Sequence, residues 1–350
     1  MDTQTHIIKP GYILPSAAFN IPAKNIKSYI FTDKNPEIGD LVYGKIKRLG
    51  QHGEIENKNG RLHKIIDGRC TIFVMGNRYA PDYYEAIIPE NFSKTIDVIS
   101  RSGMIGNVLN KNEQIKDPTK IEILGYVLDD KNQIINTRNY YCNSNKNTNS
   151  SFPTNSHRAK LILIVGTSMN SGKSQTCSSI CWSLCSMGHK VRASKITGTA
   201  SLKDILHMED AGAERISDFT HLGYPSTYLL SEEQLLDIFN TLDNKYANNP
   251  SKFWIVEIAD GLLQKETAML LANPIIQKRI HKLIFSAYDS IGALGGIKML
   301  KNQFNLIPDA ISGICSSSPL SIKEISQETS IPVINNLYPN IQQVFSIING

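Results

Sequence analysis

The chain has 350 residues, of which 41% are hydrophobic and 20% charged, a balance typical of an ordinary folded protein. This length exceeds what one hydrophobic core usually holds, so two domains are expected. No apolar run reaches the roughly 18 residues of a membrane helix. The start also lacks a basic flank followed by an apolar stretch, so we expect a cytoplasmic protein without a membrane partner. The six cysteines are too sparse for a disulfide framework, which indicates reduced thiols.

Residues 1–142 are predicted to form a β-rich N-terminal domain. The stretches that mix β-branched and aromatic residues with Gly and Asn-Gly punctuation are residues 40–50, 52–66 and 70–81. Within the second stretch, Asn59-Gly60 separates two short strand-like runs and predicts a hairpin. The sequence IGDLVYGKIKRLGQHG, residues 38–53, resembles the first strand of an S1 or other OB-type barrel. We therefore expect a small barrel or a curled sheet.

Positive charge is concentrated in this domain. Residues 41–80 hold eight Lys or Arg against three acids, a net charge of +5. One interpretation is a nucleic-acid partner, with phosphate attraction and base stacking. The candidates for stacking are Tyr43, Phe73 and Tyr79. The other interpretation, which we favour, is docking on the second domain or on a protein partner, with the lysines merely solvated. His52 and His63 flank the hairpin but have no evident third ligand for a metal.

A linker is predicted at residues 143–156, where Asn, Ser and Thr dominate and bury too little to offset their ordering entropy. Residues 157–350 then alternate short apolar runs with helix-sized stretches. This pattern predicts an α/β fold, a doubly wound and mostly parallel sheet with a phosphate loop. The expected strands are residues 161–165, 190–196, 253–259, 282–288, 309–315 and 331–334.

The first of these runs leads into a candidate phosphate loop, IVGTSMNSGKSQT, which begins at Ile164. After it, apolar positions recur at helical spacing. The loop therefore joins a strand end to a helix N-terminus, where unpaired N–H groups and the helix dipole favour an anion. We expect Lys173 to reach the β- and γ-phosphates and Ser174 to ligate Mg²⁺; the alternative is a polar capping turn. The predicted nucleotide-binding residues are Gly166, Thr167, Ser168, Met169, Asn170, Ser171, Gly172, Lys173, Ser174 and Gln175.

Three cysteines share one face of the helix that follows this loop. Cys177, Cys181 and Cys185 recur every four residues. A metal-binding stripe is one interpretation of this spacing. We favour the other, small buried residues that let the helix lie close to a sheet, because free cysteine is usually just buried.

The loop has an unusual length, because five residues separate Gly166 from Gly172 where the general pattern has four. With Thr167, Lys173 and Ser174, this spacing resembles the phosphate loop of dethiobiotin synthetase. Its P-loop relatives include ligases, cobyrinate amidases and MinD-like switch ATPases. The resemblance spans about residues 160–340, about half of the chain. It implies ATP-dependent chemistry with Mg²⁺, and a homodimer with sites near its interface.

The resemblance also assigns residues after later strands. The match to the second strand of the synthetase gives Lys195, which would neutralise substrate or γ-phosphate charge, and then Asp210 as a Mg²⁺ ligand. The third strand aligns Glu257 with the metal-binding glutamate of the family. Ser174, Asp210 and Glu257 form a chemically sensible Mg²⁺ set. The structural alternatives are a solvated strand end for Lys195 and a helix-surface acid for Asp210. Asp260 departs from the family's glycine and would orient a water or an acceptor, or cap a turn.

The identity of the base stays open. The synthetase family reads adenine with an asparagine after its fifth strand, where this chain has Ser316. Asn335 and Asn336, after the last predicted strand, are weaker candidates. The expected cofactors are therefore ATP or GTP, with Mg²⁺.

Two classes of function follow. The leading one is γ-phosphoryl transfer to a small carboxylate- or carbamate-type acceptor, or hydrolysis with water as the acceptor, with Lys173, Lys195 and Asp260 as catalytic residues. The alternative is a nucleotide-driven switch ATPase or GTPase whose N-terminal domain engages nucleic acid or a protein. MinD-like switches carry a second lysine early in the loop, and Thr167, Ser168 and Met169 offer none, which favours the enzyme.

Overall fold

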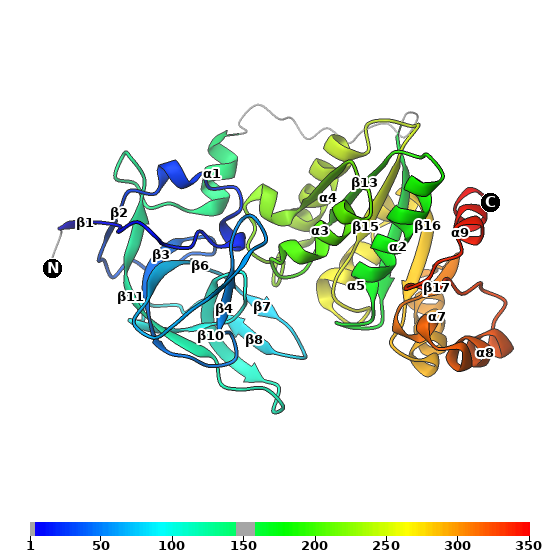
Figure 1. Ribbon diagram of the computed structural model, residues 1–350, viewed down its shortest axis with the longest axis horizontal. Coiled ribbons are helices and arrows are strands. Elements are labelled where there is room, and N and C mark those ends of the chain that lie inside the picture. Colours follow the sequence, from blue (N-terminus) through cyan, green and yellow to red (C-terminus); the bar gives the residue numbers. More distant parts are fainter. Residues whose placement is uncertain (1–3, 145–157) are drawn as a thin grey trace. The chain divides into compact units, whose positions relative to one another are not determined.

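The structure, a computed structural model, describes residues 4–144 and 158–350 (Figure 1). Except for residues 143 and 144, the predicted linker lies outside the described residues. The chain divides into two compact units. The first comprises residues 4–144, Thr199–Leu202 and Phe219–Leu229, and the second comprises residues 158–198, Lys203–Asp218 and Leu230–Gly350. None of the helices in these ranges is long and apolar enough to cross a membrane.

The first unit is built on a β-sheet that closes on itself. Its strands are β1 (Thr5–Ile7), β2 (Ser28–Ile30), β3 (Leu41–Arg48), β6 (Cys70–Met75), β7 (Arg78–Tyr79), β8 (Tyr84–Ile87), β9 (Thr95–Val98), β10 (Met104–Lys111) and β11 (Thr119–Leu128). Strand β11 pairs with β3, β3 with β6, β6 with β10, β10 with β9, and β9 again with β11. Only the β6–β10 pair in this ring is parallel. The expected barrel is therefore present; its relation to OB-type barrels stays a prediction.

Short elements complete this unit. The predicted hairpin forms between β4 (Glu54–Glu56) and β5 (Leu62–Lys64), with Gly60 at a positive φ of 81° in the turn. The helices are η1 (Ser16–Ala18), η2 (Ala23–Asn25), α1 (Thr137–Ser144) and η4 (Phe219–Leu222). Alternate residues of the barrel strands point inward, so Val42, Phe73 and Ile121 form part of a buried cluster.

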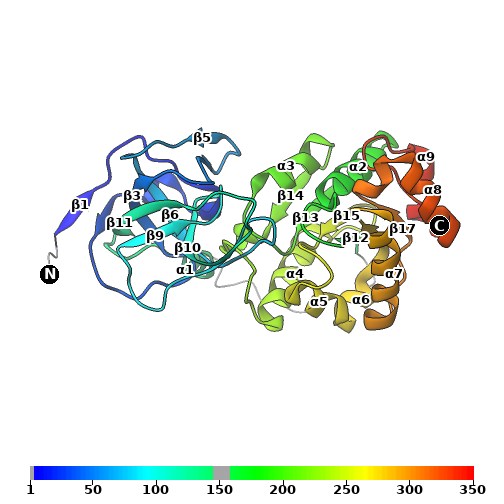
Figure 2. The same ribbon diagram turned by 90° about the horizontal axis from the view of Figure 1, so that it is seen from below.

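The second unit is an α/β domain with a fully parallel sheet in the order β14-β13-β15-β12-β16-β17 (Figure 2). The strands are β12 (Lys160–Gly166), β13 (Val191–Lys195), β14 (Arg215–Asp218), β15 (Phe253–Glu257), β16 (Ile280–Ser286) and β17 (Ala310–Ser312). The helical elements are α2 (Lys173–Ser186), α3 (Leu202–Asp210), α4 (Glu232–Tyr246), α5 (Lys265–Ala272), α6 (Pro274–Arg279), α7 (Ser290–Phe304), η5 (Ile314–Ser317), α8 (Pro319–Glu328) and α9 (Ile341–Asn349). The predicted fold class is confirmed.

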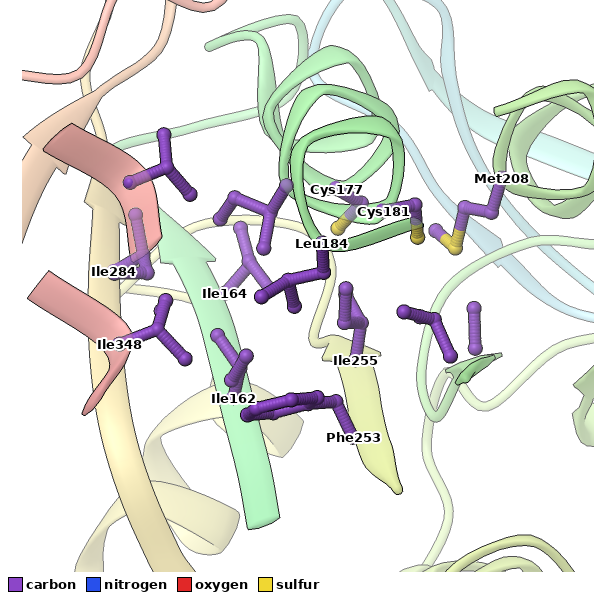
Figure 3. Close-up of a cluster of buried hydrophobic side chains, with 14 of the residues drawn as sticks. Ile162, Ile164, Cys177, Cys181, Leu184, Met208, Phe253, Ile255, Ile284 and Ile348 are labelled. Carbon is purple, nitrogen blue, oxygen red and sulfur yellow. The ribbon is translucent and has the colours of Figure 1, made fainter. Parts of the chain in front are cut away.

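Helix α2 packs on this sheet through small and branched side chains. Cys177 and Cys181 are fully buried beside Ile164 and Ile255 of the central strands (Figure 3). Met208 of α3 lies next to Cys181, so α2 and α3 are neighbours on the same face. Burial raises the pKa of both thiols well above its usual range. The cysteine stripe is therefore a packing surface.

One predicted strand does not form, and one strand of the sheet was not predicted. Residues 331–334 contribute only an isolated bridge between Val333 and Ile311. At the opposite edge of the sheet, β14 pairs with β13. The sequence of β14, RISD, is short and polar. An edge strand has a neighbour on one side only, so it can form from residues with little apolar content.

Two of the three predicted stacking residues of the first unit are buried. Phe73 is fully buried, Tyr43 is 6% exposed, and Tyr79 is half-buried against Tyr228. The two histidines do not pair either. His52 is buried beside Arg78, whereas His63 lies 3.1 Å from the side-chain nitrogen of Asn57.

Candidate functional site

The predicted phosphate loop joins β12 to the first turn of α2. Gly166 ends the strand, where an added Cβ would lie 2.9 Å from both Lys173 Cγ and Ser286 O. Gly172 is the residue before the helix and has a φ of 92°, which favours glycine. An added Cβ there would lie 3.0 Å from Gly313 Cα and from the Ile314 nitrogen. Both glycines are therefore required by close backbone packing.

The loop residues between the two glycines differ in exposure. Ser168 and Asn170 are exposed, and Asn170 has a left-handed φ of 60°. The Ser168 hydroxyl donates to the carbonyl of Met169 at 3.0 Å. Ser171 is fully buried, and its carbonyl accepts from the Ile314 N–H at 3.1 Å. The buried end of the loop is thus fixed while its outer turn faces solvent.

Lys173 is the first residue of α2, and its side chain is buried. Its side chain is 5% exposed, and its Nζ donates to the carbonyl of Ser168 at 2.7 Å. Burial lowers the pKa of Lys173, against the opposite pull of the Glu257 and Asp260 carboxylates. Its other hydrogen-bond partner in residues 4–144 and 158–350 is the Ser171 hydroxyl at 3.5 Å. Because both partners are uncharged, an incoming phosphate would give this buried ammonium an anionic partner.

A second polar atom of the loop also lacks a partner within the described residues. The hydroxyl oxygen of Thr167 is buried and forms no hydrogen bond there. The Thr167 backbone N–H, in contrast, donates to Ser286 O at 3.0 Å. A buried hydroxyl without a partner is costly, so this group too favours a polar ligand in the loop.

Four side chains meet next to the start of α2. Ser174 Oγ lies 3.3 Å from a Glu257 carboxylate oxygen and 3.5 Å from an Asp204 carboxylate oxygen. The Lys195 ammonium forms an ion pair with Asp204. Lys195 and Glu257 face each other in the pairing of β13 with β15, both at the carboxyl ends of their strands. This edge is where open α/β sheets bind ligands.

The charged groups of this cluster shift the pKa values of one another. Burial raises the pKa of the Glu257 carboxyl, against the lowering effect of Lys195. Burial alone would lower the pKa of Lys195, but the Asp204 and Glu257 carboxylates outweigh it and raise that pKa above its usual range. Lys195 is therefore a permanent cation at neutral pH.

Asp210, the Mg²⁺ ligand implied by the family resemblance, lies at the other end of α3 from the residue that contacts Ser174. It is the last residue of α3, six residues beyond Asp204, which corresponds to about 9 Å along the helix. The residue beside Ser174 is Asp204, in the first turn of α3. Helix α3 begins at Leu202, so Asp204 lies in its first turn beside the site, whereas the family spacing pointed to the end of this helix; the role of Asp210 as a Mg²⁺ ligand stays a prediction. An acid at the start of the helix after the Lys195 strand was the signal that could have identified Asp204.

Asp260 follows β15 and lies near the same charges. Its carboxylate acts on the pKa of both Lys173 and Lys195 in the raising direction. Its backbone N–H points to the Gln264 side-chain oxygen at 3.4 Å. Asp218 was missed by sequence reasoning. It ends β14, is fully buried, and faces Lys195 in the strand pairing.

The residues predicted as candidates for base recognition form hydrogen bonds with backbone groups or neighbouring loops. Ser316 Oγ donates to Gly313 O at 2.7 Å and accepts from the Asn336 N–H at 3.0 Å. Asn335 accepts from the N–H groups of the next turn at 2.9 Å. The carbonyl of Asn336 accepts from Gln175 at 3.2 Å, which ties this loop to α2.

No cluster of three or more His, Cys, Asp or Glu residues suitable for a metal occurs in residues 4–144 and 158–350. A cation at Ser174 would therefore depend on phosphate oxygens and waters for most of its ligands. Mg²⁺ commonly takes this arrangement, with only one or two protein ligands.

The sequence matches no protein-family model and no curated protein. Among solved structures, the chain is similar to the signal recognition particle receptor FtsY from Elizabethkingia anophelis in complex with GDP. The identity is 14%, the coverage is 61% of this chain and 70% of that chain, and the TM-score is 0.37. Chloroplast FtsY from Physcomitrella patens is 12% identical, with coverage of 61% and 72% and a TM-score of 0.36. Likenesses of this size assign neither a family nor an activity.

Proposed function

We propose that this chain binds a nucleoside triphosphate with Mg²⁺ at residues 166–174 and hydrolyses it. The observation that carries the proposal is the buried ammonium of Lys173, whose hydrogen-bond partners among the described residues are uncharged: Ser168 O at 2.7 Å and Ser171 Oγ at 3.5 Å. The loop also presents helix N–H groups and the buried Thr167 hydroxyl. These groups fit a phosphate chain.

The residues also fit a Mg²⁺ ion bound with the nucleotide. Ser174 would hold it, and the carboxylates of Asp204 and Glu257 would orient its waters. Bound Mg²⁺ supplies neutralisation of phosphate charge. Lys173 and Lys195 add fixed positive charge at the same edge, and Asp260 would orient a water. Positioning and charge then provide most of the catalysis.

We infer that hydrolysis drives a switch, the alternative considered from the sequence. Helix α3 begins at Leu202, whose N–H donates to the Glu56 carboxylate at 3.0 Å, and Ala200 lies in the core of the first unit. Two residues further along, Asp204 contacts Ser174 and Lys195. A ligand that displaces Asp204 therefore also acts on a helix start that is anchored in the first unit.

Transfer of the γ-phosphoryl group to a small carboxylate or carbamate is the second candidate. It is favoured by the buried, permanently charged Lys195. Asp204 already neutralises this ammonium, however, so less charge is available for an anionic acceptor. Stimulation of hydrolysis by a macromolecular partner would favour the switch, and stimulation by a small acceptor would favour the transferase.

For the partner of the first unit we propose a protein rather than a nucleic acid. The burial of Tyr43 and Phe73 removes two of the three rings considered for base stacking. A homodimer, expected from the family resemblance, is part of the same proposal and would be tested by light scattering with and without nucleotide.

The switch is tested by hydrogen exchange with the Mg²⁺ complexes of non-hydrolysable ATP and GTP analogues. We expect altered exchange in residues 166–174, in residues 199–206 and in β4, which carries Glu56. The variant Glu56→Gln should keep the change at 166–174 and lose the change in β4, because the amide is a weaker acceptor for the Leu202 N–H. Changes confined to 166–174 in the wild type would contradict the switch and leave a simple hydrolase or transferase.

A further inference from the structure

A cavity of about 680 Å³ lies beside α2, within the ~300–1,000 Å³ range of small-molecule sites. One wall is a face of α2 that includes Gln175 and Trp182. The lining also includes His207 and Asp210 at the end of α3, and Tyr338 in the loop before α9. The catalytic cluster around Ser174 does not use these side chains.

The cavity begins where the phosphate loop ends. Gln175 follows Ser174 directly, and its side-chain nitrogen donates to Asn336 O, which holds the loop before α9 against the helix. Helices α2 and α3 pack side by side through Cys181 and Met208 (Figure 3), and residues of both helices line the cavity. A nucleotide with its phosphates on Lys173 would therefore place its nucleoside in or beside this cavity.

The lining suits a planar heterocycle. Trp182 is 46% exposed and Tyr338 is 84% exposed, although large aromatic rings are normally much more buried. Exposed aromatic rings in the lining of a cavity are suited to stacking a base.

The Asp210 carboxylate in the lining favours a ligand that presents hydrogen-bond donors. Asp210 is exposed and is the last residue of α3, where the negative end of the helix dipole disfavours a negative charge. N–H donors from a ligand would relieve this unfavourable position. A carboxylate can accept two parallel N–H bonds, and it repels a group that offers only a lone pair.

We propose that this cavity binds the guanine base of the nucleotide, with Asp210 accepting hydrogen bonds from the N1–H and the 2-amino group and with Trp182 stacking on the ring. The assignment rests on the proposed function, because it needs the phosphates at residues 166–174. Guanine presents two adjacent donors on that edge. Adenine presents a lone pair at N1, which faces the carboxylate unfavourably.

The test compares binding of the Mg²⁺ complexes of GTP, ATP, ITP and XTP by isothermal titration calorimetry. The wild type should prefer GTP over ATP by about 5- to 150-fold, the discrimination expected of one bidentate base contact. ITP, which lacks the 2-amino group, should bind more weakly than GTP. Asp210→Asn should weaken GTP and strengthen XTP, because the amide can donate to the 2-oxo group of xanthine. Glu209→Gln, the exposed neighbouring acid on the same helix, should change none of these affinities.

Fluorescence gives an independent readout of stacking. The chain has two tryptophans, and Trp254 is fully buried with its indole N–H on Ser194 Oγ. Quenching by GTP should therefore come from Trp182 and vanish in Trp182→Phe. Persistence of the quenching in that variant would overturn the stacking assignment.

The outcomes separate this inference from the proposed function. Equal binding of ATP and GTP by the wild type, or an unchanged ratio of GTP to XTP affinity in Asp210→Asn, would overturn guanine recognition. If Lys173→Ala then binds no nucleotide, the phosphate loop assignment still stands. If Lys173→Ala binds all nucleotides as tightly as the wild type, the proposed function fails and this inference fails with it.

Discussion

Lys195, at the end of β13, forms an ion pair with Asp204 in the first turn of α3. The same carboxylate lies 3.5 Å from Ser174 Oγ, the expected Mg²⁺ ligand. Asp204→Asn should therefore weaken the apparent Mg²⁺ affinity about 10- to 100-fold, as loss of a residue that orients metal ligands commonly does. The measurement is nucleotide hydrolysis at saturating nucleotide over a Mg²⁺ titration.

Glu209→Gln is the matched control for this experiment, because Glu209 is an exposed acid near the other end of the same helix. Its Mg²⁺ dependence should equal that of the wild type at saturating nucleotide. A shift in Asp210→Asn without one in Asp204→Asn would identify Asp210 as the magnesium ligand inferred from the family resemblance.

Gly172 is expected to tolerate no side chain. Its φ of 92° and the 3.0 Å approach of Gly313 and Ile314 predict that Gly172→Ala lowers the free energy of unfolding by about 1–3 kcal/mol and abolishes nucleotide binding. Gly188→Ala is the control, because Gly188 has a similar φ of 82° but nothing within 4 Å of an added Cβ. Thermal melts and nucleotide titrations of both variants check this. Normal binding by Gly172→Ala would contradict the tight loop.

The first unit should lose stability in mild acid because of His52. Burial, together with the Arg78 guanidinium beside it, lowers the pKa of this imidazole to about 3. Below pH 6.5 the unfolded chain takes up a proton that the folded protein does not accept until about pH 3, so stability falls as pH falls through this window. The contribution is about 2 kcal/mol between pH 7 and pH 5.

Urea unfolding followed by circular dichroism at pH 7, 6 and 5 measures this effect. In His52→Gln the dependence on pH should be flatter by that amount, since glutamine does not titrate. Parallel curves for the wild type and His52→Gln would show that another group governs the acid sensitivity.

Much of the second unit could be predicted from the sequence, because buried parallel strands are continuous apolar runs. LILIV at residues 161–165 and FWIVE at 253–257 lie in β12 and β15, as expected. β14 was missed because its sequence, RISD, has the period and composition of neither a buried strand nor a helix. Nor could the sequence indicate that Thr199–Leu202 and Phe219–Leu229 join the first unit, since local pattern carries no information about distant partners.

The candidate site likewise contains residues that the sequence could place and residues that it could not. The phosphate loop is a contiguous motif, so its glycines and Lys173 could be placed by spacing alone. Asp204 could not be placed by spacing, because its role depends on where α3 starts. That start carries a hydrogen bond from Leu202 to Glu56, 146 residues earlier in the chain. The cavity beside α2 likewise depends on Tyr338, which is brought to Gln175 and Trp182 only by the fold.

The most direct test of the account is the thermal stability of the wild type and of Lys173→Ala with Mg²⁺ and GTP or ATP. A ligand at a hundred times its Kd stabilises the folded protein by about 2.7 kcal/mol, which should raise the wild-type midpoint by several degrees. Because burial lowers the pKa of Lys173, and its ammonium bonds to uncharged groups of the loop within the described residues, the variant should fold and show no shift. No shift in the wild type with either nucleotide, or an equal shift in Lys173→Ala, would contradict a nucleotide site at this loop.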